Sequence, residues 1–238
     1  MFQQSIPPSI RKANPEDWDQ ISKLSSISGY EDYINEMGPS FLQDGTILMA
    51  ENKILLGFMK ITILPDGYAW FSAVRVHPDY RRHGVGNNLL LEALERSHNE
   101  NAGGCRLMIE DSNFRSKGLA LKNGFHEVLD LLLFEGGFSL EGLEEDQIND
   151  DEYISMGWEF CRFNSKLKDC VLKYTLDDGK LYQYEDGKGK YQFITNPFTR
   201  KISTDVRYSA VPYQDVPVSF PLKPVEGFRR AQVFEIKF

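Results

Sequence analysis

The stretch VRVHPDYRRHGVGN, residues 74–87, joins a strand pattern to a helix pattern. Before it, residues 68–76 are rich in aromatic and β-branched side chains, as strands are. After it, Val85, Leu89 and Ala93 recur at every fourth position, the spacing of one helix face. The stretch is therefore predicted to be a strand-to-helix turn.

Two glycines, Gly84 and Gly86, stand at alternate positions in this turn. Glycine lets the backbone come close to a bulky anion, while the free amides and the dipole of a helix N-terminus favour negative charge. Arg81, Arg82 and His83 add positive charge beside those amides. The turn is predicted to bind phosphate or pyrophosphate, although a lone Gly-x-Gly also fits a tight turn without a ligand.

Outward from this turn, the periodicity predicts alternating strands and helices. Two turn-forming segments, 51–53 and 65–67, separate three strands in the pattern of an antiparallel meander. The predicted order is strand 10–13, helix to about 26, loop 28–44 with at most a short helix, strands 46–50, 54–64 and 68–76, helix 84–97, strand 105–109, helix 114–122 and strand 125–134.

Arg81-x-x-Gly84-x-Gly86 resembles the Arg/Gln-x-x-Gly-x-Gly/Ala acyl-CoA signature of the GNAT N-acetyltransferases, and Val76-His77-Pro78 is similar to that family's strand-to-loop junction. Asn113 stands twelve positions before Phe125, the spacing that the family shows between the Asn after its fifth strand and the Gly-Phe of its sixth. The resemblance covers about residues 10–135, and the predicted order of elements is the GNAT order.

The resemblance implies an α/β GNAT fold with a mixed, mostly antiparallel central sheet splayed between strands 4 and 5. Acetyl-CoA would be the cosubstrate, with its pantetheine arm in the wedge and its pyrophosphate on the amides of residues 82–87. The residues expected at the cofactor are Val74, Val76, Arg81, Arg82, His83, Gly84, Val85, Gly86, Asn87 and Asn113. No metal site is expected.

In this family an amine attacks the thioester directly, so the amine must lose a proton and the leaving thiolate should gain one. The tyrosine that often protonates the thiolate is replaced here by Ala120, and residues 68–76 contain no carboxylate to serve as a base. Glu110 is the candidate base, with Asp111 beside it; a solvated strand end or a helix cap is the plain alternative. His77 is a weaker candidate because a His-Pro pair usually serves a turn.

Glu31, Asp32 and Glu36 lie in the loop that in GNAT proteins borders the acceptor pocket, where they would hold a cationic amine or simply form an exposed acidic loop. The leading hypothesis is an acyl-CoA-dependent N-acyltransferase that acetylates a primary amine of a small molecule or peptide. The rival is a catalytically silent GNAT fold that binds acyl-CoA or a partner protein, which the missing tyrosine supports.

We expect two regions, a GNAT domain over 1–139 and a β-rich region over 140–238 that packs on it. Strands are predicted at 171–176, 181–184 and 191–195, and the following prolines are taken to exclude central strands until 231–238. That last run alternates like a half-buried strand. The many aromatic residues of this region either form its core or line a pocket.

The net charge of -8, from 27 basic and 35 acidic residues, argues against nucleic acid or anionic lipid as a partner. No apolar run is long enough to span a membrane, and the N-terminus lacks the apolar stretch of a signal peptide. The spacing of Cys105, Cys161 and Cys170 fits neither a disulfide scaffold nor a zinc site. A cytoplasmic location is therefore expected, while the oligomeric state is not predicted.

Overall fold

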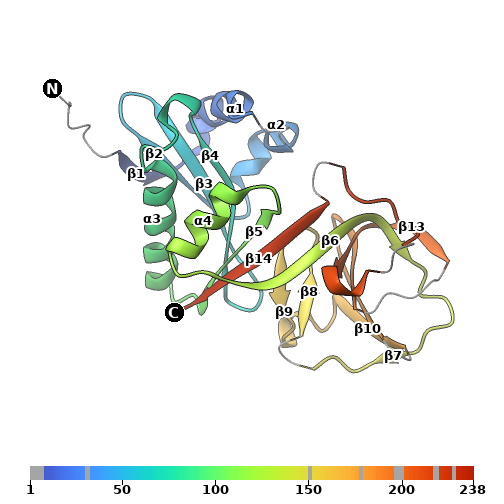
Figure 1. Cartoon of the computed structure of the whole chain (residues 1–238). Helices are drawn as coiled ribbons and strands as arrows, with labels where there is room; N and C mark the ends of the chain where they lie inside the picture. The colour runs from blue at the N-terminus through green and yellow to red at the C-terminus, as the bar shows by residue number, and fades with distance from the viewer. Residues whose placement is uncertain are drawn as a thin grey trace. The chain divides into compact units, whose positions relative to one another are not determined.

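The computed structural model describes residues 8–29, 33–149, 152–176, 179–195, 201–216, 220–226 and 229–238. The chain divides into two compact units (Figure 1). Unit 1 comprises residues 1–63, 69–105 and 237–238, and unit 2 comprises residues 64–68 and 106–236. Each unit is described by itself.

Unit 1 is built on an antiparallel sheet in the order β1-β2-β3-β4, in which β2 to β4 form the predicted three-strand meander and β1 adds a fourth strand at its edge. Its strands are β1 (Ser9–Lys12), β2 (Thr46–Glu51), β3 (Leu55–Ile63) and β4 (Ala69–Val76). Its helices are α1 (Trp18–Ile27), α2 (Tyr33–Met37) and α3 (Val85–Asn99), with short 3-10 turns at Pro15–Asp17, Gly38–Leu42 and Pro78–Tyr80.

The helices of unit 1 cover both faces of this meander. Ile21 of α1 shares a core with Phe58 of β3 and other buried residues. Gly57, the residue before Phe58, faces the opposite side of the sheet, since successive residues of a strand alternate between its faces. On that side Val85 and Leu89 of α3 pack against Gly57. The periodic apolar positions that predicted α3 are thus the ones that bury it.

An ion-pair cluster ties the start of unit 1 together. Arg11 makes two hydrogen bonds of 2.7 Å to the Asp17 carboxylate and also contacts Glu51 at 2.9 Å. The same Asp17 carboxylate accepts from the backbone N–H of Asn14 at 2.8 Å. Chiefly because of the hydrogen bonds from Arg11, the pKa of Asp17 lies below its ordinary value of 3.8.

We expect this cluster to make stability fall in acid. A carboxyl group whose folded-state pKa is depressed contributes its full stabilisation above its unfolded pKa, here about 3.8, and loses it as the pH falls through the lower folded value. Thermal unfolding measured between pH 5 and pH 2.5 should therefore show a falling midpoint. D17N should be less stable at pH 5 and show a shallower fall. An equal fall in D17N and the parent would contradict this assignment.

Unit 2 contains the strand order β5-β14-β6-β13-β12-β11-β10-β7, antiparallel in most pairs, with β12 and β13 parallel. The first elements are β5 (Gly104–Glu110), which begins in unit 1, α4 (Phe114–Lys122) and β6 (His126–Phe138). They are followed by β7 (Glu145–Asp146), β8 (Tyr153–Ser155), β9 (Phe160–Arg162), β10 (Val171–Leu176), β11 (Gly179–Asp186), β12 (Gly189–Thr195), β13 (Ile202–Pro212) and β14 (Arg230–Lys237).

Three features of unit 2 correct the sequence predictions. β6 does not stop near Phe134 but runs through Gly137, where a Cβ would lie only 2.5 Å from the Gln192 side chain. β13 is an internal strand between β6 and β12, because the proline-free run from Ile202 to Val211 is long enough to pair on both sides. The short strands β7, β8 and β9 were not predicted.

β14 is a central strand. It pairs with β6, and the backbone N–H of Asp111 just beyond β5 donates to the Arg230 carbonyl at 2.8 Å. The predicted half-burial is wrong, because Val233, Phe234 and Glu235 are buried in succession and consecutive residues face opposite sides.

A buried charge cluster explains how β14 can carry Glu235. Arg106 of β5, fully buried, donates to Glu235 at 2.7 Å and to Asp66 at 2.5 Å. Its guanidinium lies 3.9 Å from the ring centre of Tyr68. The Arg162 backbone N–H also donates to Asp66, at 2.8 Å. Paired charges of this kind hold polar groups inside a core that would otherwise exclude them.

Many of the C-terminal aromatic residues lie in the core, as the first of the two interpretations expects. Among the described residues, the buried ones are Phe160, Tyr174, Tyr182, Tyr184, Tyr191, Phe193 and Phe234, whereas Trp158 is exposed.

Candidate functional site

A bulge interrupts β4 just before the predicted phosphate turn. Phe58 of β3 lies opposite Arg75 and Lys60 lies opposite Ser72, so Ala73 and Val74 together face one residue of β3. Ala73 takes a left-handed φ of 54°, which is uncommon for a side chain other than glycine. The bulge leaves Val74 39% exposed in a strand whose first three residues are buried.

The turn after β4 is ordered by its own hydrogen bonds. The backbone N–H of His77 donates to Leu56 of β3 at 2.8 Å, and its ring Nδ1 accepts from the Asp79 N–H at 3.3 Å. His77 therefore serves the turn, as the plain interpretation expects. The His83 ring contacts the Arg81 carbonyl at 2.9 Å.

Gly84 immediately precedes α3. Its φ of 82° is left-handed, it provides no side-chain cap, and a Cβ at this position would meet no atom within 4 Å. The first helical hydrogen bond is from the Asn88 N–H to the Gly84 carbonyl at 2.9 Å. Within the described ranges, the N–H groups of Val85 and Gly86 donate to no acceptor. An open, positively polarised helix end of this kind suits an anionic ligand.

The two arginines of the turn, Arg81 and Arg82, differ in the contacts of their side chains. Arg81 donates through Nη2 to the Ser28 carbonyl and through Nε to the Val76 carbonyl at 3.4 Å. The neighbouring Arg82 has a left-handed φ of 67°, is exposed, and makes no side-chain bond recorded among the described residues. Arg82 is therefore the freer cation beside the helix end.

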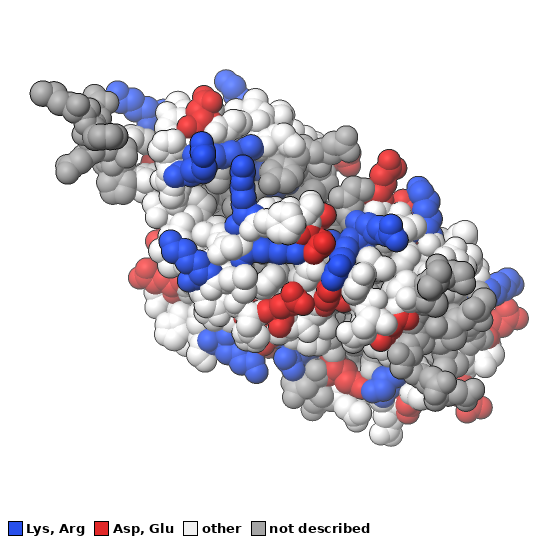
Figure 2. Space-filling model, viewed as in Figure 1, with Lys and Arg blue, Asp and Glu red and all other residues white. Residues whose placement is uncertain are grey.

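On the face that Figure 2 shows, basic and acidic side chains are interspersed.

Two of the predicted site residues lie in unit 2 and have structural contacts there. Asn113 caps α4, with its side-chain oxygen accepting from the Ser116 N–H at 3.1 Å. Glu110, at the end of β5, accepts a hydrogen bond from the Ser112 hydroxyl. Ala120 is 1% exposed in α4, so a tyrosine placed there would overpack its surroundings.

Asp111 belongs to a network that the sequence did not reveal. It accepts from Lys117 at 2.6 Å and from Gln232 of β14 at 3.0 Å. Gln232 also reaches Asp130, which binds Arg230 through two hydrogen bonds. Mainly because of Lys117, the pKa of Asp111 lies below its ordinary value of 3.8, so this carboxylate is a poor proton acceptor. Of the residues that contact Asp111 in this network, only Lys117 is close enough in sequence for a local pattern to have indicated the contact.

The acidic loop is only partly described. Glu36 is exposed on α2, and Glu31 and Asp32 lie outside the described residues. In the described ranges no cluster of His, Cys, Asp and Glu could hold a metal ion. Nor does any helix in those ranges have the length and apolar character that crossing a membrane requires.

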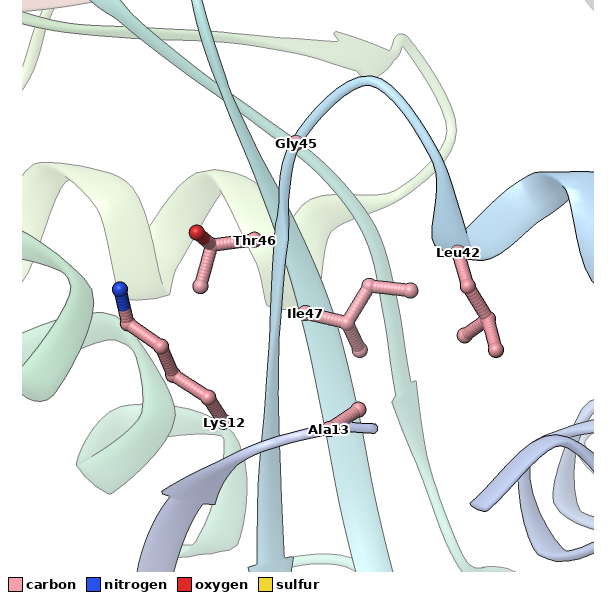
Figure 3. A pocket seen from close by; sticks show the side chains of 6 residues that line it. All are labelled: Lys12, Ala13, Leu42, Gly45, Thr46 and Ile47. Atoms are coloured by element: carbon pink, nitrogen blue, oxygen red, sulfur yellow. The ribbon is translucent and has the colours of Figure 1, made fainter. Parts of the chain in front are cut away.

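A hollow of about 240 Å³ in unit 1 lies away from the turn (Figure 3). It is lined by Lys12, Ala13, Leu42, Gly45, Thr46 and Ile47. Thr46 pairs with Ile61 at one end of the meander, whereas Val76 pairs with Gly57 near the other end. This hollow is therefore separate from the proposed phosphate turn.

Residues 12–125 match the model of the acetyltransferase (GNAT) family. This part of the chain is a GNAT acetyltransferase domain, which confirms the resemblance seen in the turn and in the order of elements.

Two solved structures share the fold over nearly the full length. A putative acetyltransferase from Thermoplasma acidophilum is 15% identical with a TM-score of 0.64, covering 97% of this chain and 100% of that one. A putative acetyltransferase from Pyrococcus horikoshii is 16% identical with a TM-score of 0.58, covering 100% of this chain and 91% of that one. At this identity the likeness concerns the fold alone. No curated protein matches the sequence significantly.

Proposed function

We propose that this protein transfers an acetyl group from acetyl-CoA to a primary amine of a small molecule or peptide. The observation that carries the proposal is the start of α3, where a Cβ at Gly84 would meet no atom within 4 Å and the N–H groups of Val85 and Gly86 donate to no acceptor in the described chain. Its occurrence inside a GNAT acetyltransferase domain makes the pyrophosphate of acetyl-CoA the fitting anion.

In this proposal the backbone amides of residues 82–87 hold the pyrophosphate, with Arg82 and His83 adding charge. Backbone groups of Val74 and Val76 pair with the pantetheine arm, for which the bulge in β4 frees part of the strand from regular pairing with β3. Asn113 completes the cofactor set, acting through the start of α4 that it caps.

Acetyl-CoA supplies the thioester. The residues of the protein orient the two substrates and accept the amine proton. The neutral amine nitrogen bonds to the carbonyl carbon, the carbon–sulfur bond breaks, and the thiolate leaves with the electron pair. The amine proton passes to Glu110, directly or through water, and the thiolate takes a proton from water. Glu110 is preferred to Asp111 because the Asp111 carboxylate is already held by Lys117.

A second candidate is a GNAT domain that binds acyl-CoA without turnover. The buried Ala120 favours it, since no hydroxyl stands at the position that often protonates the thiolate. Direct attack on a thioester depends largely on positioning and carbonyl polarisation, so loss of this acid need not abolish transfer.

One pair of measurements separates the candidates. Calorimetric titration with CoA tests the cofactor site, and thiol release from acetyl-CoA across a panel of primary amines tests transfer. Binding with amine-dependent thiol release supports the acetyltransferase, whereas binding with none for any amine supports the silent domain. No CoA binding would refute both.

We expect G86V to weaken CoA binding at least tenfold, about 1.4 kcal/mol, because a branched side chain in the first turn of α3 would stand between the amides and the pyrophosphate. Gly86 is the better probe, since Gly84 has a left-handed φ that valine resists. The matched control is G187V, in the β11–β12 turn, where a Cβ meets no atom within 4 Å. Unchanged affinity in folded G86V would refute this cofactor site.

A further inference from the structure

Arg81 lies in the turn but its guanidinium is directed elsewhere. Nη2 donates to the carbonyl of Ser28, 53 positions earlier, and Nε donates to the carbonyl of Val76 at the end of β4. A planar guanidinium has several donors in a fixed fork, so one side chain can link two carbonyls at once. Arg81 thus connects the proposed phosphate turn to the end of α1.

The end of α1 needs such a partner. Ser28 follows the last helical residue and is 2% exposed, and Gly29 then leaves the helix with a φ of 81°. A buried carbonyl at a helix C-terminus lies at the negative end of the dipole and requires a donor. The last turn of α1 contains no basic residue, so the cation comes from Arg81.

We propose that Arg81 is a positioning residue that couples the cofactor turn to the C-terminal end of α1, rather than a ligand of the pyrophosphate. This inference rests on the proposed cofactor site. A ligand bound to the amides that follow Arg81 orders the backbone of the turn. The two hydrogen bonds of the Arg81 guanidinium then restrict the motion of the backbone at Ser28 as well. Because coupling between two sites is reciprocal, loosening the end of α1 also weakens ligand binding.

The coupling has a consequence for the acceptor side. The chain leaves Ser28 and, after residues outside the described ranges, forms α2 and the 3-10 turn Gly38–Leu42. Under the proposed function, this segment borders the acceptor amine. Arg81 therefore influences where the amine is held, and its loss should raise the KM for the amine more than it lowers kcat.

The test compares R81M, R81K and R82M by amide hydrogen exchange of residues 22–29, with and without saturating CoA. R82M is the matched control because it removes the same charge from the adjacent position, where the side chain makes no hydrogen bond or ion pair with the part of the chain that the structure describes. R81K keeps the positive charge but loses the planar guanidinium that donates to both carbonyls.

In ligand-free protein we expect exchange at the end of α1 to be about tenfold faster in R81M, intermediate in R81K and unchanged in R82M. CoA should slow this exchange in the parent and in R82M but not in R81M, although R81M still binds CoA. A merely structural role of Arg81 would leave the CoA-dependent protection in place and would overturn the coupling.

The alternative, in which Arg81 binds the pyrophosphate directly, predicts a different result. Unchanged exchange in R81M, with CoA affinity reduced as much as in R82M, would overturn the positioning role. Failure of the parent protein to bind CoA would instead refute the proposed function. The ligand-free exchange of R81M would still report whether Arg81 holds the end of α1.

Discussion

A chain that ends at Gly136 is expected to be insoluble or to lack a cooperative thermal transition. Such a chain loses β14, which lies between β5 and β6 and buries Val233 and Phe234. Burying these two side chains contributes on the order of 3 to 6 kcal/mol, comparable with the whole stability of many domains. We therefore propose that residues 140–238 are not a detachable domain.

A second truncation isolates the contribution of β14. A chain ending at residue 229 keeps β7 to β13 and should fail in the same way, whereas removal of Phe238 alone should be tolerated because its side chain is 46% exposed. Soluble expression, calorimetric unfolding and CoA titration provide the measurements. A soluble 1–136 fragment with a sharp transition and undiminished CoA binding would show that the C-terminal region is an independent module.

Replacement of Arg106 by methionine should be the most destabilising single substitution among those considered. Arg106 is fully buried between Glu235 and Asp66, and its loss leaves two carboxylates without their main partner. Removing one partner of a buried ion pair costs about 3 to 5 kcal/mol. For a protein of this size the midpoint of thermal unfolding should fall by roughly 6 to 20 °C.

Two further variants show whether the loss comes from unpaired charge. R96M breaks a partly exposed pair with Glu92 within α3 and should cost about 0.5 kcal/mol or less. The double variant R106M/E235M removes both charges of the pair that joins β5 to β14, so it should cost less than the sum of the two single substitutions. Additive costs, or a loss below about 1 kcal/mol in R106M, would show that the cluster contributes little.

The strands and the longer helices of unit 1, and the glycine turn before α3, could be predicted from local sequence patterns. Helix α3 was predicted from apolar residues four apart, and α4 was predicted at its observed bounds, because such patterns depend on neighbours within one or two turns. The Gly84 turn was also visible, since a left-handed residue before a helix favours glycine for purely local reasons.

Contacts between residues far apart in the chain could not be predicted and are visible only in the folded structure. The place of β14 between β5 and β6, the internal strand β13, and the contact from Arg81 to Ser28 each join residues far apart in the chain. Glu235 shows the reason most clearly: its position in a strand pattern predicts a half-exposed carboxylate, and burial becomes favourable only when Arg106, 129 positions away, supplies the charge. Local periodicity carries no information about a partner that folding alone brings into contact.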